Sequence, residues 1–261
     1  FALQLDRGRI DEPLYNLLPS KKFPDARLLE LAPLTQHFQS RLVRQPRQNA
    51  LRAIGRLFIQ LTADTARELG NGSAWVSGKD TIITSAHNVF DFSNQAWSHA
   101  LQFHPAYDYY ASDPLPTCRV VSCRIPRAYT KNPASNYDIA ICKVDRNIGE
   151  LIDAEIPIRQ VESNDFFDQN SVAIVGYPVA SSFDFGKQMW RSRGEYLFGQ
   201  THHPDEDFAP VLATDFGGGA SGCPWVIKEP FTGELLAVGV TSGHAKLRYA
   251  EGESNLMSLV S

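Results

Sequence analysis

The sequence has few cysteines, no long apolar run and no excess of positive charge. Its 4 cysteines among 261 residues are too few for a disulfide-stabilised scaffold. No apolar stretch approaches the roughly 18–20 residues that a membrane span requires. The 25 Lys and Arg are outnumbered by 29 Asp and Glu, which argues against nucleic acid as the main partner. No repeat of fixed period is present, which excludes solenoids and propellers.

The cysteines are expected to be free thiols. Cys118 and Cys123 fall in one predicted strand, and their odd separation places them on opposite faces, too far apart to bridge. Cys142 lies in another apolar strand, and Cys223 follows a Ser-Gly pair. Buried, unpaired thiols are the expectation for such positions.

What the sequence does contain is a long series of short apolar runs separated by Gly, Pro, Asn and Asp. Hydrophobic residues make up 43% of the chain, an ordinary globular value. The runs read IGRLFIQL, SAWVSG, TIITSA, VVSCRI and DIAICKV, followed by SVAIVGY, KQMWRSRGEYLF, PVLATDF, CPWVIK and LLAVGV. Many short strands joined by turn residues predict an all-β sandwich or barrel instead of alternating βαβ units.

The beginning of the chain has a different pattern of apolar residues, typical of helices. Residues 25–32 and 33–43 are predicted to be helical, because in the second segment Leu34, Phe38 and Leu42 recur every four residues. The first residues, FALQLDRGRIDEP, reach a charge too early for the apolar region of a signal peptide. Further along, the polar stretch 146–170 is predicted to link two β lobes.

Three segments carry residue types used in hydrolytic catalysis. His87 ends the run TIITSAH, Asp138 opens the strand in NYDIAI, and Ser221 is enclosed by glycines in GGGASGCP. Each alone has an ordinary interpretation: a structural histidine, a turn aspartate, a flexible hairpin.

Together the three residues supply the groups that a serine needs to act as a nucleophile. A serine hydroxyl is a poor nucleophile at neutral pH and needs an imidazole to take its proton, while a carboxylate orients that imidazole. Attack on an amide also builds negative charge on oxygen, which convergent backbone N–H groups stabilise by several kcal/mol. A Gly-x-Ser turn can aim the N–H groups of Gly219 and Ser221 at one point.

These motifs resemble those of the chymotrypsin-like serine proteases, and their order, His then Asp then Ser, matches that family. The segments IVGYP and QMWRSRGEY and the glycine-rich serine loop are most similar to the bacterial glutamyl endopeptidase branch. The resemblance covers roughly residues 51–250. It implies two antiparallel β-barrels, at 51–150 and 151–261, preceded by an N-terminal helical extension at 1–50.

The resemblance also assigns roles. It implies that His87 is the general base and acid, Asp138 its orienting carboxylate and Ser221 the nucleophile, with the Gly219 and Ser221 N–H groups as oxyanion hole. The segment Thr241-Ser242-Gly243 would pair with the substrate backbone, and the Thr241 hydroxyl would bond the triad aspartate. No cofactor is implied. The implied partner is a protein or peptide substrate, and the implied location is secreted or periplasmic.

The sequence departs from the family at the positions that set specificity. Ala220 replaces the aspartate that trypsin-type enzymes pair with a new N-terminus, and Thr241 stands where glutamyl endopeptidases place a glutamate-recognising histidine. Specificity for Glu is therefore not expected. Asp215 matches the pocket-floor aspartate of trypsin, which would favour Arg or Lys at the cleaved position. An aspartate that caps its own turn is the alternative.

The other histidines are not expected to form a metal site. The run His202–Asp207 holds metal-ligand residue types but is predicted to be a solvated loop, and His99 and His104 lack partners at metal spacing.

Two alternatives to a peptidase remain open. One is a protease-like binding module that is silent or covered by residues 1–50, and the other is an esterase with the same triad.

Overall fold

The computed structural model describes residues 38–63, 69–133, 137–161, 165–200, 209–248 and 254–260. The helix predicted over 25–32 and the run His202–Asp207 lie outside these residues. All pairings between the named strands are antiparallel, which confirms the all-β prediction.

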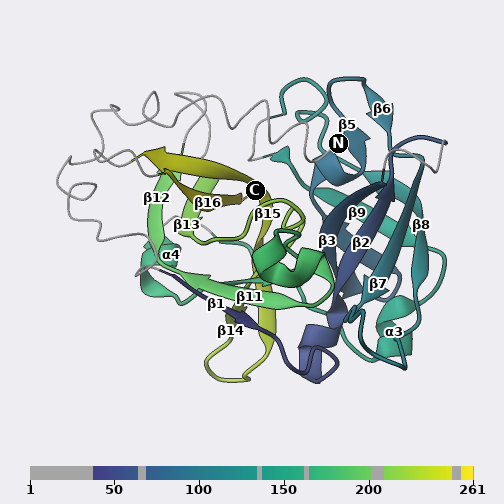
Figure 1. Cartoon of the computed structure of the whole chain (residues 1–261), viewed down its shortest axis with the longest axis horizontal. Coiled ribbons are helices and arrows are strands. Elements are labelled where there is room, and N and C mark those ends of the chain that lie inside the picture. The colour runs from purple at the N-terminus through teal and green to yellow at the C-terminus, as the bar shows by residue number, and fades with distance from the viewer. Residues whose placement is uncertain are drawn as a thin grey trace.

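The first half of the chain closes into a barrel, seen at the right of Figure 1. Its strands follow the order β2-β3-β4-β9-β8-β7 around the barrel. They are β2 (Ile54–Gln60), β3 (Leu69–Gly78), β4 (Thr81–Thr84), β7 (Ala100–Pro105), β8 (Cys118–Arg124) and β9 (Ala140–Val144).

The second half, joined by β1 from the beginning of the chain, forms an 8-stranded sheet of order β1-β11-β10-β14-β15-β16-β13-β12, at the left of Figure 1. Its strands are β1 (Phe38–Leu42), β10 (Ala173–Gly176), β11 (Trp190–Gly194), β12 (Tyr196–Gln200), β13 (Ala209–Ala213), β14 (Pro224–Lys228), β15 (Leu235–Arg248) and β16 (Ser254–Val260).

Short elements connect these strands. They are η3 (Asn49–Ala53), η4 (Ala86–Asn88), β5 (Phe90–Asp91), β6 (Ala96–Trp97), α3 (Ile148–Ile152), α4 (Asp165–Gln169) and η6 (Ser181–Gly186). The helices α3 and α4, the α-helices of the described residues, fall in the stretch 146–170. This stretch lies between β9, the last barrel strand, and β10 of the second sheet.

The predicted helix over 33–43 is wrong at Phe38–Leu42, which is strand β1. All five residues of this strand pair with β11, from Phe38 opposite Gly194 to Leu42 opposite Trp190. A separation of four residues is an even number, so Phe38 and Leu42 share a face in a strand as well as in a helix. The spacing of apolar residues therefore cannot distinguish a helix from a strand here. Pairing with the edge strand β11 decides in favour of the strand.

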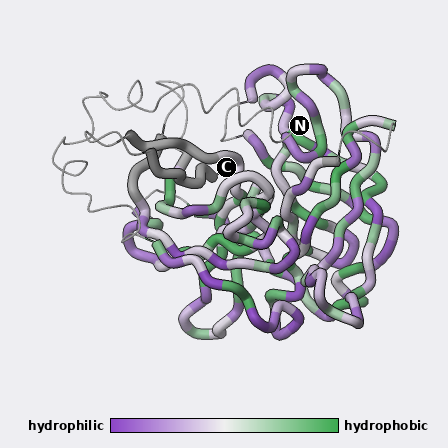
Figure 2. Tube along the Cα trace, viewed as in Figure 1, coloured by the Kyte–Doolittle hydropathy of each residue, from purple (hydrophilic) through white to green (hydrophobic). Residues whose placement is uncertain are grey.

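Apolar side chains fill the closed barrel in alternation. In β9 the buried Ala140, Cys142 and Val144 alternate with the exposed Ile141 and Lys143. Figure 2 shows hydrophobic (green) and hydrophilic (purple) segments interspersed along the barrel strands. A second cluster, centred on Trp225 and Phe216, lies in the other sheet. The barrel cluster also contains residues of the second sheet, among them Val175, Val226 and Val240, so it continues across the junction between the two halves of the chain.

The prediction that Cys118 and Cys123 lie on opposite faces is wrong. Both contribute to the core of the closed barrel, Cys118 fully buried and Cys123 half-buried. The register of β8 against β9 shifts between Val120 and Ser122, so one extra residue, Val121, bulges out of the ladder. A bulge reverses the side-chain alternation beyond it. All four cysteines are free thiols in the structure.

Candidate active site

His87 is positioned by the end of a barrel strand. The β-branched residues of Thr81–Thr84 favour strand β4, and the chain then turns into η4, which contains His87. The side chain is buried, with 4% exposure. Its backbone N–H donates to Asp138 Oδ1 at 2.9 Å, and its ring Nδ1 lies 2.6 Å from Asp138 Oδ2. Two contacts to one carboxylate fix the orientation of the imidazole.

Asp138 precedes strand β9 and is 3% exposed. Besides His87, its Oδ2 accepts a hydrogen bond from Ser242 Oγ at 2.6 Å. Burial opposes ionisation of this carboxyl, but the charge on His87 and the hydrogen bonds from His87 and Ser242 outweigh burial and lower the pKa of Asp138. The group is therefore held as a carboxylate against the imidazole.

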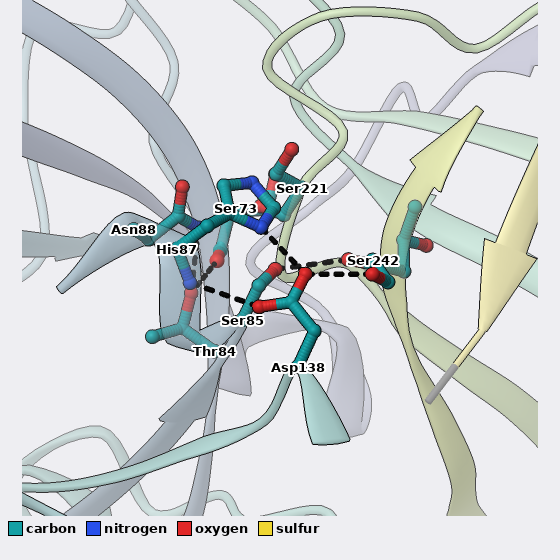
Figure 3. Close-up of polar contacts among 9 residues, drawn as sticks. Ser73, Thr84, Ser85, His87, Asn88, Asp138, Ser221 and Ser242 are labelled. Atoms are coloured by element: carbon teal, nitrogen blue, oxygen red, sulfur yellow. Dashed lines mark hydrogen bonds and ion pairs between the residues drawn. The ribbon is translucent and has the colours of Figure 1, made fainter. Parts of the chain in front are cut away.

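Ser221 comes from the second half of the chain, and its backbone is tied to the first half. Its carbonyl accepts hydrogen bonds from the Ser73 N–H at 2.8 Å and from Asn88 Nδ2 at 3.1 Å. Ser73 lies in β3, and Asn88 directly follows the histidine. In Figure 3 the imidazole of His87 lies between the Asp138 carboxylate and Ser221. Among the described residues no hydrogen bond joins the Ser221 hydroxyl to this ring.

Gly222 allows the serine loop to approach the first barrel closely. Its φ is +84°, and a Cβ there would lie 2.0 Å from the Ser73 carbonyl oxygen and 2.2 Å from Thr84 Oγ1. No larger residue fits at this contact. The Gly222 N–H donates to the Thr241 carbonyl at 2.8 Å. The glycines around the serine therefore serve contact between the two halves of the chain.

Two backbone N–H groups beside Ser221 are free to bind an oxyanion. Neither the Gly219 N–H nor the Ser221 N–H donates to any acceptor in the part of the chain that the structure describes. The Gly218 carbonyl, which could otherwise turn toward them, accepts the Val179 N–H at 2.8 Å. The Gly219 carbonyl accepts Ser73 Oγ at 3.0 Å, and Gly219 has a φ of +82°. Both flanking carbonyls are thus held elsewhere.

The expectation that the Thr241 hydroxyl bonds the triad aspartate is wrong, because Ser242 makes that bond. Thr241 Oγ1 instead accepts the indole N–H of Trp225 at 3.1 Å, inside the second core. Successive residues of β15 point to opposite faces, so only one of the pair can face Asp138. The register shift of β15 against β16 between Thr241 and Gly243 also falls here.

Asp215 is exposed and lies beside strand β1. Its carboxylate accepts a hydrogen bond from Ser40, whose hydroxyl also contacts Ser192 Oγ at 2.9 Å. The turn that follows is capped by Thr214, whose Oγ1 accepts the Phe216 N–H at 3.1 Å. No Lys or Arg among the described residues forms an ion pair with Asp215. The carboxylate is therefore not used in capping its own turn.

The structure brings the predicted His87 and Asp138 into direct contact and places the Ser221 loop beside them, and three further residues that the sequence did not indicate hold this arrangement. These are Ser73, Asn88 and Val179, which donate hydrogen bonds to backbone carbonyls of the serine loop. The only sequence signal was adjacency, since Asn88 follows the histidine. Hydrogen bonds to backbone atoms leave little trace in residue type.

The described residues contain no group of three or more metal-binding side chains. They also contain no helix long and apolar enough to cross a membrane. His104 packs edge-on against Phe58, with ring centroids 4.7 Å apart.

Comparison with solved structures shows which known proteins have a similar fold. The chain is similar to a Glu endopeptidase structure with a TM-score of 0.63 and 20% identity, covering 85% of this chain and 91% of that one. It is also similar to the thermostable serine protease AL20 from an extremophilic microorganism, with a TM-score of 0.60 and 19% identity over 79% and 89% of the two chains. The protease Anisep from Arthrobacter nicotinovorans gives a TM-score of 0.60 and 21% identity over 80% and 89%.

No protein-family model and no curated protein matches the sequence. The structural likeness nevertheless shows the fold: the chain has the chymotrypsin-like double-barrel architecture that the sequence motifs predicted.

Proposed function

We propose that the protein is a serine endopeptidase that hydrolyses peptide bonds through an acyl-enzyme. The observation that carries this proposal is the buried hydrogen-bond chain from Ser242 through Asp138 to His87, next to which Asn88 bonds the backbone carbonyl of Ser221. A module that only binds has no physical need for an imidazole held by a buried carboxylate next to a serine.

Each residue has a step in the proposed mechanism. Ser221 Oγ attacks the scissile carbonyl while His87 Nε2 takes its proton, and the same nitrogen later gives a proton to the leaving amine. Asp138 keeps the ring in the productive tautomer and stabilises the imidazolium. The N–H groups of Gly219 and Ser221 stabilise the charge that develops on the carbonyl oxygen. Water then repeats the sequence on the acyl-enzyme, without any cofactor.

The substrate backbone would pair with the segment Thr241-Ser242-Gly243 as an added antiparallel strand. The Thr241 N–H and carbonyl already bond Cys223 and Gly222. From Gly243 onward one edge of β15 is paired with β16, so the substrate would pair along the opposite edge. Export from the cell, which the family resemblance implies, is part of the same proposal.

Asp215 is proposed to select Arg or Lys at the cleaved position. Its carboxylate receives only a neutral donor, Ser40, from the described part of the chain, so its charge is available to a substrate cation. A panel of peptides varied at that position tests this role. Wild type should favour Arg and Lys, and Asp215→Ser should lose the preference, whereas a wild type indifferent to charge would refute it.

The test of the reaction compares matched peptide amides and peptide esters on the full chain and on Ser221→Ala. Hydrolysis of both substrates by wild type and of neither by the variant supports a peptidase. Cleavage of esters alone indicates an esterase. Absence of cleavage by folded wild type indicates a binding module.

A further inference from the structure

Two thiols face each other across strands β8 and β9. Cys123 and Cys142 are direct register partners in this antiparallel pair. Both contribute to the core of the closed barrel, and their Sγ atoms lie 3.0 Å apart. That separation exceeds a disulfide bond length by only about 1 Å.

We propose that Cys123 and Cys142 form a cross-strand disulfide under oxidising conditions. The bulge at Val121 makes this pairing possible, because it turns Cys123 inward toward Cys142. Cys118 and Cys223 are different, since the described residues hold no second sulfur within contact of either. The proposal concerns the barrel alone, so it stands or fails independently of the peptidase function.

The two thiols have unequal access to solvent, which sets their order of reaction. Cys123 is half-buried, whereas Cys142 is fully buried. The Cys142 S–H donates toward the Cys123 sulfur, which lowers the pKa of Cys123, while the same contact and burial raise the pKa of Cys142. Cys123 is therefore the thiol that meets a small oxidant, and Cys142 completes the bond.

The oxidant is a small-molecule disulfide such as oxidised glutathione. The Cys123 thiolate attacks one of its sulfurs, a mixed disulfide forms and one small thiolate leaves. The Cys142 sulfur then attacks the Cys123 sulfur, gives up its proton and expels the second small thiolate. The protein loses two protons and two electrons in all, and the small disulfide becomes two thiols.

The bond would close the chain segment that carries Asp138. This segment leaves β8 after Cys123 and returns into β9 at Cys142, passing through the triad carboxylate. Closing it restricts the unfolded chain more than the folded one. We therefore expect the oxidised protein to have a Tm higher by about 5 °C or more.

The test is made on the full chain equilibrated with oxidised or with reduced glutathione, then denatured and alkylated. We expect the oxidised sample to have lost two hydrogens in mass before alkylation. After alkylation it should yield one cross-linked peptide joining Cys123 to Cys142, with Cys118 and Cys223 alkylated. The reduced sample should show four alkylated thiols. Four alkylated thiols after oxidation, or a cross-link through Cys118, would overturn the proposal.

A matched pair of variants separates the bond from general effects of losing a thiol. Cys123→Ser should abolish both the cross-link and the rise in Tm on oxidation. Cys118→Ala removes a thiol from the same strand and should retain both. Retention of the Tm rise in Cys123→Ser would contradict the assignment, and peptide mapping of wild type decides the pairing even where a variant folds poorly.

Discussion

The two halves of the site are built in opposite ways. His87 and Asp138 of the first barrel are buried, and both oxygens of the Asp138 carboxylate accept hydrogen bonds, from the His87 backbone and ring and from Ser242 of the second half. In the second half, Ser221 is held through its backbone carbonyl alone. Its hydroxyl and the neighbouring N–H groups stay without partners among the described residues. The Asp138 carboxylate, which must keep its orientation, therefore has hydrogen bonds to both oxygens. The Ser221 hydroxyl and the neighbouring N–H groups, which would meet the substrate, have none within the described part of the chain.

The largest effect on kcat is expected when one proposed catalytic group is removed from each half of the site. His87→Ala should lower kcat by about 10⁶-fold, because without the imidazole the Ser221 hydroxyl stays protonated. The double variant His87→Ala, Ser221→Ala should lose no more than either single variant, since the halves act as one unit. Steady-state kinetics on a peptide substrate measures this, and additive losses would contradict it.

The second half should depend on backbone geometry. Gly219→Ala places a Cβ 2.6 Å from Val179 Cγ1 and 2.7 Å from the Tyr177 carbonyl oxygen, at a φ of +82°. The oxyanion-binding N–H must then move, and we expect kcat to fall by about 10²–10³-fold. Gly78→Ala, where the nearest atom is Thr81 Cβ at 3.8 Å, is the matched control. Equal kcat in the two variants would exclude the proposed oxyanion hole.

Substitutions of the neighbouring residues Thr241 and Ser242 should affect different properties, Tm for the first and kcat for the second. Ser242→Ala removes a donor to Asp138, and we expect a loss of about 10-fold in kcat. Thr241→Val leaves the indole N–H of Trp225 unsatisfied in the core and should lower Tm more than kcat. Parallel kinetics and thermal melts compare the two variants. The assignment fails if Thr241→Val has the larger effect on kcat.

The smallest expected effect is on stability in acid. The pKa of Asp138 is lower in the folded state than its ordinary unfolded value of about 3.9. The ionised carboxylate therefore stabilises the fold above about pH 4, and this contribution disappears as pH falls through the folded pKa. The Tm difference between wild type and Asp138→Asn should shrink over that range. A difference independent of pH would show that Asp138 is not held ionised.

The sequence predicted the strands and the catalytic residue types but not their supports. His87, Asp138 and Ser221 stand in motifs whose residue types the chemistry requires, so reading them needs no three-dimensional information. Strand β1 could not be recognised, because its four-residue spacing suits a helix and only its pairing with β11 decides. The inward turn of Cys123 depends on the bulge at Val121, which is a property of two strands together.

The supports of the serine loop escaped prediction for a related reason. Ser73 and Val179 bond backbone atoms of residues far away in the chain, and many residue types supply an N–H equally well. Side chains that react can be recognised by their chemistry. Groups that position a backbone can be recognised only once the fold has placed them.

The most direct test of the central claim is covalent labelling of the folded full chain with a fluorophosphonate, followed by mapping of the adduct. The account predicts stoichiometric modification at Ser221, which disappears in His87→Ala although the hydroxyl is still present. Modification at a different serine, or undiminished labelling without the imidazole, would contradict the assembly of the two halves into one catalytic unit.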